Sequence, residues 1–189
     1  EEQNYTEEVL FFTDFNIDKV YKGLEIGAGV APINEDITIS NWGHIEEPFK
    51  SYYGQITGTD LGILWEKYGR RLFTENIRNF LGSSTVNDEI IKTIKTEPDN
   101  FIYFNNGITI LCENIKKKLL GGSDKSIGAF TCNGISVVNG AQTLGSIGSL
   151  HTTNPDELGN VKVTVKFISL EDSPMGFGQR ITVATNTQN

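Results

Sequence analysis

The sequence contains few of the residues that usually bind zinc or act as nucleophiles, since its 189 residues include only two cysteines and two histidines. Neither His44 nor His151 has a cysteine or second histidine at metal-ligand spacing, which argues against a zinc site and against Ser-His-Asp catalysis. Two cysteines are too few for a disulfide framework, and Cys112 lies in the apolar run ITILC. We therefore expect buried, inert thiols and a cytoplasmic location, predict no metal site, and leave any cofactor open.

The chain also lacks an excess of positive charge, because 16 lysines and arginines stand against 24 acidic residues for a net charge of -8. This balance argues against a domain that coats nucleic acid by charge alone. Local basic sites remain open at Lys116–Lys118 and around Arg70, Arg71 and Arg78, although the lysine run is typical of solvated surface. No apolar run is long enough to cross a bilayer, so we expect no membrane partner.

The composition is that of an ordinary globular domain, with 38% hydrophobic and 21% charged residues. We expect one main domain over residues 50–189 and an unmatched, irregular segment or small lobe over residues 1–49. The chain begins with Glu rather than Met and stops directly after ATNTQN, so we expect a fragment of a longer protein. Its oligomeric state is left open.

Periodicity predicts a mixed α/β (α+β) fold with a single mixed sheet flanked by helices. Strands are expected at 37–40, 52–57 and 161–170, and helices at 60–68 (N-cap Thr59), 86–96 (N-cap Asn87), 141–150 and 177–186. Between the second and third helices, the patterns NFIYF-NNG-ITILCEN and GAFTC-NG-ISVV predict two hairpins.

Three Asn-Gly pairs stand at 106–107, 133–134 and 139–140, and hairpin turns account for the first two. In VVNGAQT the third pair leads from a strand into a helix, whose first N–H groups attract anions. We predict Asn139 as the N-cap, Gly140 at the turn, and Gln142 and Thr143 beside those donors. The alternative is a capped helix and a bend with no ligand.

Four stretches occur in a characteristic order: RRLFTENIRNFLG, VNDEIIKTIKTEPDNFIYFNNGITILCEN, ISVVNGAQT and ATNTQN. Over roughly residues 50–189 the chain resembles the AIPR family, the abortive-infection phage-resistance proteins of bacteria and archaea. The family patterns LFxxNxRxxLG, FxYxNNGIT, VNGxQT and TNxQN fall here on Leu72 to Gly82, Phe101 to Thr109, Val138 to Thr143 and Thr185 to Asn189.

A weaker resemblance links Asn-Gly-x-Gln to the DGQHR turn and to ParB-like and sulfiredoxin-like domains, which implies a core of that type. Thr143 and Leu144 stand where those families carry His and Arg, so a phosphate contact needs Arg78 or Arg180. The ligand-binding residues implied by the motifs are Arg78, Asn105, Asn106, Gly107, Asn139, Gly140, Gln142, Thr143, Asn186 and Gln188.

Amides, hydroxyls, glycine and arginine dominate these motifs, and such groups recognise ligands more readily than they catalyse. We therefore predict a module that binds nucleotide or nucleic-acid phosphate, and expect Asn106, Gln142 and Asn186 to face one cleft. A metal-dependent nuclease or nucleotide hydrolase is one alternative, and a protein-interaction or regulatory module is the other. The carboxylates near the motifs show no metal-site spacing; they are Glu75, Asp88, Glu89, Asp99 and Glu113.

Overall fold

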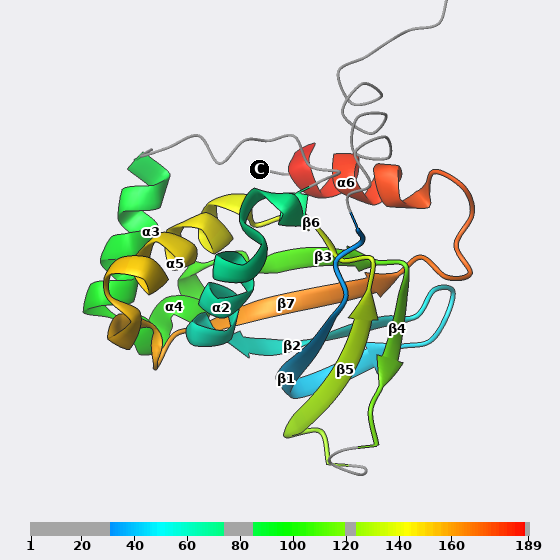
Figure 1. Cartoon of the computed structure of the whole chain (residues 1–189), viewed down its shortest axis with the longest axis horizontal. Coiled ribbons are helices and arrows are strands. Elements are labelled where there is room, and N and C mark those ends of the chain that lie inside the picture. Colours follow the sequence, from blue (N-terminus) through cyan, green and yellow to red (C-terminus); the bar gives the residue numbers. More distant parts are fainter. Residues whose placement is uncertain (1–30, 74–84, 120–123, 188–189) are drawn as a thin grey trace, which may run out of the picture. The chain divides into compact units, whose positions relative to one another are not determined.

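The computed structural model describes residues 31–73, 85–119 and 124–187, and the compact unit that contains the sheet begins at Ala31. Seven strands form one sheet in the order β4-β5-β1-β2-β7-β3-β6 (Figure 1). Their bounds are β1 Glu35–Ile45, β2 Ser51–Thr57, β3 Ile108–Cys112, β4 Asn114–Lys117, β5 Ile127–Asn133, β6 Ser136–Asn139 and β7 Lys162–Ser169. All neighbours are antiparallel except β3 and β7, so the predicted single mixed sheet is confirmed.

Strand β7 illustrates why the sheet has one apolar face. Val163, Val165 and Phe167 are fully buried, whereas the alternate residues Thr164 and Lys166 are exposed. Successive side chains of a strand point to opposite faces, so this alternation directs three apolar side chains into the core. The described helices at this face are α2 (Gly58–Tyr68), α3 (Thr85–Thr96) and α5 (Ala141–Thr153), which contribute Leu61, Ile94 and Leu144.

The end of the sheet formed by β7, β3 and β6 is covered on its other face as well. A second apolar cluster consists of Leu111, Val138 and Ile168, and Ile181 of α6 (Phe177–Thr187) packs against it. Figure 1 accordingly shows α6 next to β6, away from α2 and α5. None of the described helices is long and apolar enough to cross a membrane.

The sheet is strongly curled, because β4 contacts β7 although β5, β1 and β2 lie between them in the sheet order.

Cys112 of β3 and Cys132 of β5 are both fully buried and free. A hydrogen bond to Cys132, together with burial, raises the pKa of the Cys112 thiol well above its usual range. A thiol with a raised pKa is a poor nucleophile. The predicted burial of both thiols is confirmed, and their inertness stays a prediction.

Two helix starts differ from the prediction. Helix α2 begins at Gly58, and its N-cap is Thr57 instead of Thr59, with Thr57 Oγ1 accepting from the Asp60 amide at 3.0 Å. Strand β2 runs directly into this cap, so Thr57 has the extended backbone that an N-cap needs. Asn87 does not cap α3, because it lies inside the helix and is buried.

Both predicted hairpins are wrong. Residues 98–100 form a short 3₁₀ turn, η2 (Pro98–Asn100), and NFIYF continues it as helix α4 (Phe101–Phe104). Proline favours the first turn of a helix, and Pro98 begins the helical turn here. Only Phe101 of α4 is fully buried. The preference of aromatic residues for strands, which reflects packing in a sheet, therefore does not decide the structure of this segment. The second pair, Asn133-Gly134, joins β5 to β6, which pair with different strands.

The third Asn-Gly pair does pass from strand to helix as predicted. Strand β6 ends at Asn139 and α5 begins at Ala141.

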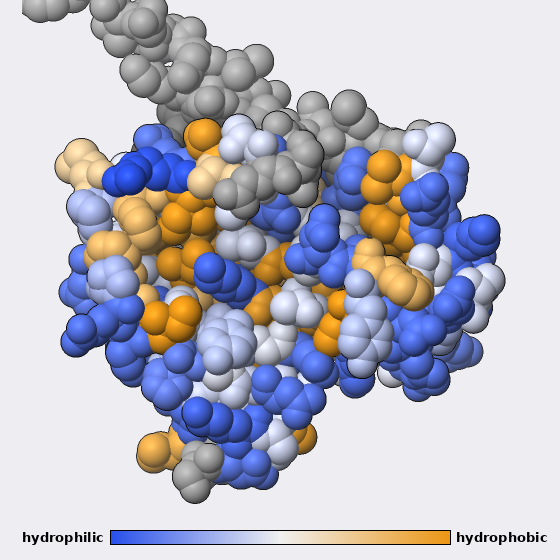
Figure 2. Space-filling model, turned by 180° about the vertical axis from the view of Figure 1, so that it is seen from behind, coloured by the Kyte–Doolittle hydropathy of each residue, from blue (hydrophilic) through white to orange (hydrophobic). Residues whose placement is uncertain are grey.

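On the face opposite to that of Figure 1, apolar side chains form small groups separated by polar ones (Figure 2). Scattered apolar groups of this kind are normal for protein surfaces.

Candidate functional site

The turn between β6 and α5 depends on a glycine. Gly140, not Asn139, is the N-cap of α5, with a left-handed backbone (φ 90°, ψ 22°) and no side chain to accept a hydrogen bond. A Cβ atom at this position would lie 2.7 Å from the Gly107 carbonyl oxygen. Both the backbone conformation and the close contact with residue 107 therefore favour glycine here.

A register shift in β6 explains why Asn139 does not cap the helix. Asn139 pairs with Thr109 and Val137 pairs with Ile110, so the register between β6 and β3 shifts by one residue at Val138. Such a bulge turns two consecutive side chains toward one side of the strand. Val138 packs in the cluster that Ile181 joins, and Asn139 Nδ2 donates to the Thr185 carbonyl at 2.8 Å.

A second hydrogen bond between these elements has its donor on α6 and its acceptor on β6. Asn186 Nδ2 lies 2.7 Å from the Val138 carbonyl oxygen and 2.7 Å from that of Thr182 in its own helix. The VNGxQT and TNxQN motifs are therefore joined by amide-to-carbonyl bonds in both directions. Each bond connects residues that are 46 or 48 positions apart in the sequence.

The FxYxNNGIT motif joins the same assembly. Asn105 Nδ2 donates to Thr143 Oγ1 at 3.0 Å, and the Gly107 amide donates to Asn105 Oδ1 at 2.9 Å. Thr143 is buried in the first turn of α5, so this contact fixes the loop before β3 against the start of that helix. We call residues 105–107, 139–143 and 185–186 the motif junction.

Two amide side chains of the motif junction, Asn106 and Gln142, are exposed. The first backbone bond of α5 runs from the Leu144 amide to the Gly140 carbonyl at 3.0 Å. The amides of residues 141–143 precede that bond, and such groups have no acceptor within their own helix. The motif junction thus combines a helix N-terminus that has no side-chain cap with two neutral hydrogen-bonding groups.

Two aromatic residues beside the motif junction were missed as candidates. Tyr103 is 80% exposed and Phe104 is 66% exposed, while Phe101 anchors α4 in the core. NFIYF was predicted as a strand of a hairpin, and neither residue was among the predicted ligand-binding residues. The sequence feature that could have identified Tyr103 as a candidate is its position in the FxYxNNGIT pattern.

Some predicted site residues lie outside the described residues, namely Arg78 and Gln188. Leu72 and Phe73, which begin the same motif as Arg78, are buried. Arg180 is exposed on α6.

Among the residues that the structure describes, no three His, Cys, Asp or Glu side chains are grouped as metal ligands. The shared cleft for Asn106, Gln142 and Asn186 stays a prediction.

Comparison with known proteins gives one family. A family model described as "AIPR protein" matches residues 73–189, which is more than half of the chain and includes the whole motif junction. Neither the curated proteins nor the solved structures contain a match to this chain. The resemblance to a ParB-like or sulfiredoxin-like core therefore stays a prediction.

Proposed function

The chain belongs to the AIPR family, and we propose that it binds a nucleotide or a nucleic-acid segment at the motif junction. Membership of this family suggests a role in abortive infection, the phage-resistance response for which it is named. The ligand-binding role is our inference from the chemistry of the motif junction.

The observation that carries the proposal is the assembly of three distant motifs around one helix N-terminus. Asn105, Asn139 and Asn186 use their amide groups to hold the motifs together. Asn106 and Gln142 are exposed instead, so they are available to a ligand.

The phosphate and the base of a nucleotide both have matching groups in this region. The N-terminus of α5 favours a phosphate, since its free amides and its dipole both attract negative charge. The amides of Asn106 and Gln142 both donate and accept, as recognition of base edges requires. The exposed rings of Tyr103 and Phe104 suit stacking on bases, which is typical of proteins that bind single strands.

Recognition is favoured over hydrolysis because the motif junction is composed of amides, hydroxyls and glycines. Amide side chains do not act readily as general bases or nucleophiles. The N-terminus of a helix contributes only about 0.3 to 1 kcal/mol toward an anion. A cationic partner is therefore part of the proposal, and Arg78 and Arg180 are the candidates from the sequence.

Titration of the chain with a panel of nucleotides and short oligonucleotides, at two salt concentrations, tests this function. Gln142→Ala is expected to weaken binding by roughly 1 to 3 kcal/mol if a buried polar contact forms in the complex. Ser149→Ala is the matched control, because Ser149 is exposed on the same helix but outside the motif junction. Equal affinities for the wild type and Gln142→Ala would contradict the proposed site.

A further inference from the structure

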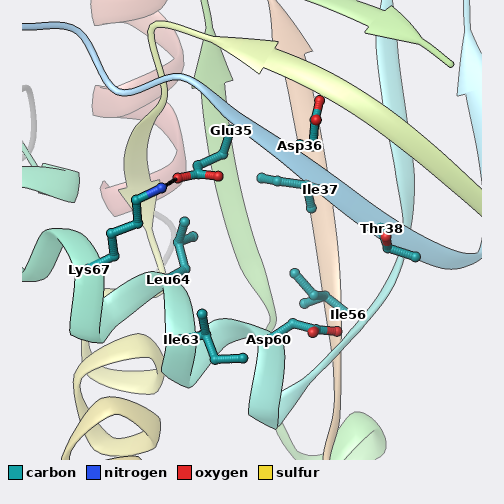
Figure 3. A pocket seen from close by; sticks show the side chains of 9 residues that line it. All are labelled: Glu35, Asp36, Ile37, Thr38, Ile56, Asp60, Ile63, Leu64 and Lys67. Carbon is teal, nitrogen blue, oxygen red and sulfur yellow. Dashed lines mark hydrogen bonds and ion pairs between the residues drawn. The ribbon is translucent and has the colours of Figure 1, made fainter.

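A second surface feature, unrelated to the motif junction, lies between β1 and α2. It is a cleft of about 210 Å³ (Figure 3). Its lining residues come from β1, from the end of β2 and from α2, and they include Asp36, Ile37, Ile56, Asp60, Ile63 and Leu64.

The cleft exists because two neighbouring strands separate. The ladder between β1 and β2 starts at the pair Ser40 and Gln55. Within the described sheet, β1 residues before Ser40 pair with β5, whereas Ile56 and Thr57 pair with β7. One edge of β1 therefore faces α2 instead of a neighbouring strand, as Figure 3 shows.

Four consecutive residues of β1, 35–38, form a wall of this cleft. Asp36 lines the cleft, although its carboxylate accepts hydrogen bonds from Thr131, at 2.7 Å, and from Lys118. The buried neighbour Ile37 points to the opposite face of the sheet from Asp36, as alternation along a strand requires. A strand edge without a partner offers a row of amide and carbonyl groups to another extended chain.

The floor of the cleft is apolar and its rim is partly open. Ile37, Ile56 and Leu64 are at most 8% exposed, whereas Ile63 on α2 is 51% exposed. An apolar side chain that entered the cleft would cover Ile63 and remove apolar surface from water. Burial of this kind supplies affinity that does not depend on charge.

The charges around the cleft leave one carboxylate without a cation among the lining residues. Glu35 pairs with Lys67, and Asp36 pairs with Lys118. Asp60 interacts instead with Thr57, whose hydroxyl lies 2.6 Å from Asp60 Oδ2. That contact accompanies the N-cap bond of α2, but it does not neutralise the carboxylate, so a cationic ligand group is favoured here over an anionic one.

We propose that the cleft binds an extended peptide of a protein partner, which adds as a strand to the open edge of β1 and places a lysine or arginine at Asp60. In this binding mode, main-chain hydrogen bonds give affinity, and pockets for alternate side chains give specificity. The peptide pattern that fits has an apolar and a basic residue two positions apart, since such residues share one face of a strand. The proposal does not depend on nucleotide binding at the motif junction.

Fluorescence anisotropy with a labelled, end-capped hexapeptide, Thr-Val-Thr-Lys-Thr-Thr, tests the proposal. Ile63→Lys is expected to weaken binding at least about tenfold, because it blocks the cleft and repels the basic residue. Ile127→Lys is the matched control, since Ile127 is 59% exposed on β5 and does not line the cleft. Circular dichroism of both variants checks that each retains the wild-type fold.

Two further measurements distinguish strand addition from simple charge attraction. A hexapeptide with alternate amides N-methylated is expected to lose binding, since it cannot pair with β1. Asp60→Asn is expected to remove the preference for this hexapeptide over the version with Glu in place of Lys. Absence of binding to the wild type, equal loss in Ile63→Lys and Ile127→Lys, or unchanged binding of the methylated peptide would each overturn the proposal.

Discussion

Two regions of the sheet, the edge that β6 forms and the surroundings of β1, are held together by different chemistry. At the motif junction, neutral amide side chains donate to carbonyl oxygens of other elements, as Asn139 and Asn186 do. Around β1, the side-chain contacts between elements include ion pairs of exposed or partly exposed residues, such as Lys67 with Glu35 and Lys118 with Asp36. Amide-to-backbone bonds of partly buried groups do not weaken with salt or pH, whereas exposed ion pairs do.

This difference suggests why the family motifs are rich in asparagine and glycine. Loops that must hold an exact shape around a helix N-terminus need directional bonds and close backbone contacts. The motif junction has both, in the Asn105 bond to Thr143 and in the contact between Gly107 and Gly140. The variants below test whether the motif junction is indeed the more sensitive of the two regions.

Gly140→Val is expected to have the largest effect. The substitution combines an unfavourable φ of 90° with a Cβ atom 2.7 Å from the Gly107 carbonyl oxygen. We expect a loss of roughly 2 to 5 kcal/mol in the free energy of unfolding, measured by urea denaturation. Loss of ligand binding in this variant would therefore not identify a binding residue, which is why Gln142→Ala is the better probe.

Gly176→Val is the matched control for Gly140→Val. Gly176 also has a positive φ, 80°, but no atom lies within 4 Å of the position that a Cβ atom would take there. This variant carries the backbone strain without the clash, so its cost is expected to stay within roughly 1 to 3 kcal/mol. Equal losses in both variants would mean that the contact between residues 107 and 140 contributes nothing.

Asn186→Ala is expected to have the next largest effect. It removes the contacts to the Val138 and Thr182 carbonyls and leaves the Val138 oxygen without this donor. We expect a loss of roughly 1 to 3 kcal/mol in thermal or urea unfolding. Asn100→Ala, at an exposed residue bonded to Glu97, should change stability by no more than about 0.5 kcal/mol.

A double-mutant cycle on Asn105→Ala and Thr143→Val measures a smaller effect. Their side chains contact each other directly, so the two changes should not be additive. We expect a coupling energy of roughly 0.5 to 1.5 kcal/mol. Additive losses would indicate that the loop before β3 and the start of α5 are held by other contacts.

The regular part of this fold was predictable, because local patterns encode it. Strand β7 shows clean alternation, and VVNGAQT combines a β-branched run, a turn and a helix start. The side-chain partners were not predictable, since the acceptor for Asn139 lies 46 residues away on α6. Its role as N-cap was the best local interpretation, and a bulge in β6 overrides it.

The error at NFIYF has a similar cause. Aromatic and β-branched residues favour strands on average, but that preference mainly reflects packing against neighbouring strands. The preceding Pro98 begins a helical turn, and the Asn105 amide closes α4 on the Phe101 carbonyl. The sequence alone could therefore identify the motif as important but could not indicate that Tyr103 and Phe104 face solvent.

The smallest expected effect concerns the ion pair between Glu35 of β1 and Lys67 of α2. Partial burial raises the pKa of Glu35, but hydrogen bonds from Lys67 and Tyr68 and the charge of Lys67 together bring it below the ordinary value of 4.5. A carboxylate with a lowered pKa stabilises the fold at pH values above its unfolded pKa, and that contribution disappears as the pH falls through the folded pKa. The affected window is therefore below about pH 4.5.

Glu35→Gln should accordingly remove part of the acid sensitivity of unfolding. Above pH 5 we expect the variant to be slightly less stable than the wild type, and the difference should shrink as the pH is lowered toward 3. Urea denaturation at a series of pH values measures it, and high salt should reduce the difference at neutral pH because the pair is partly exposed. Asn186→Ala should show a loss that changes little over the same range, since the groups involved do not titrate. A pH-independent difference for Glu35→Gln, or a strongly pH-dependent one for Asn186→Ala, would remove the distinction between the two regions of the sheet.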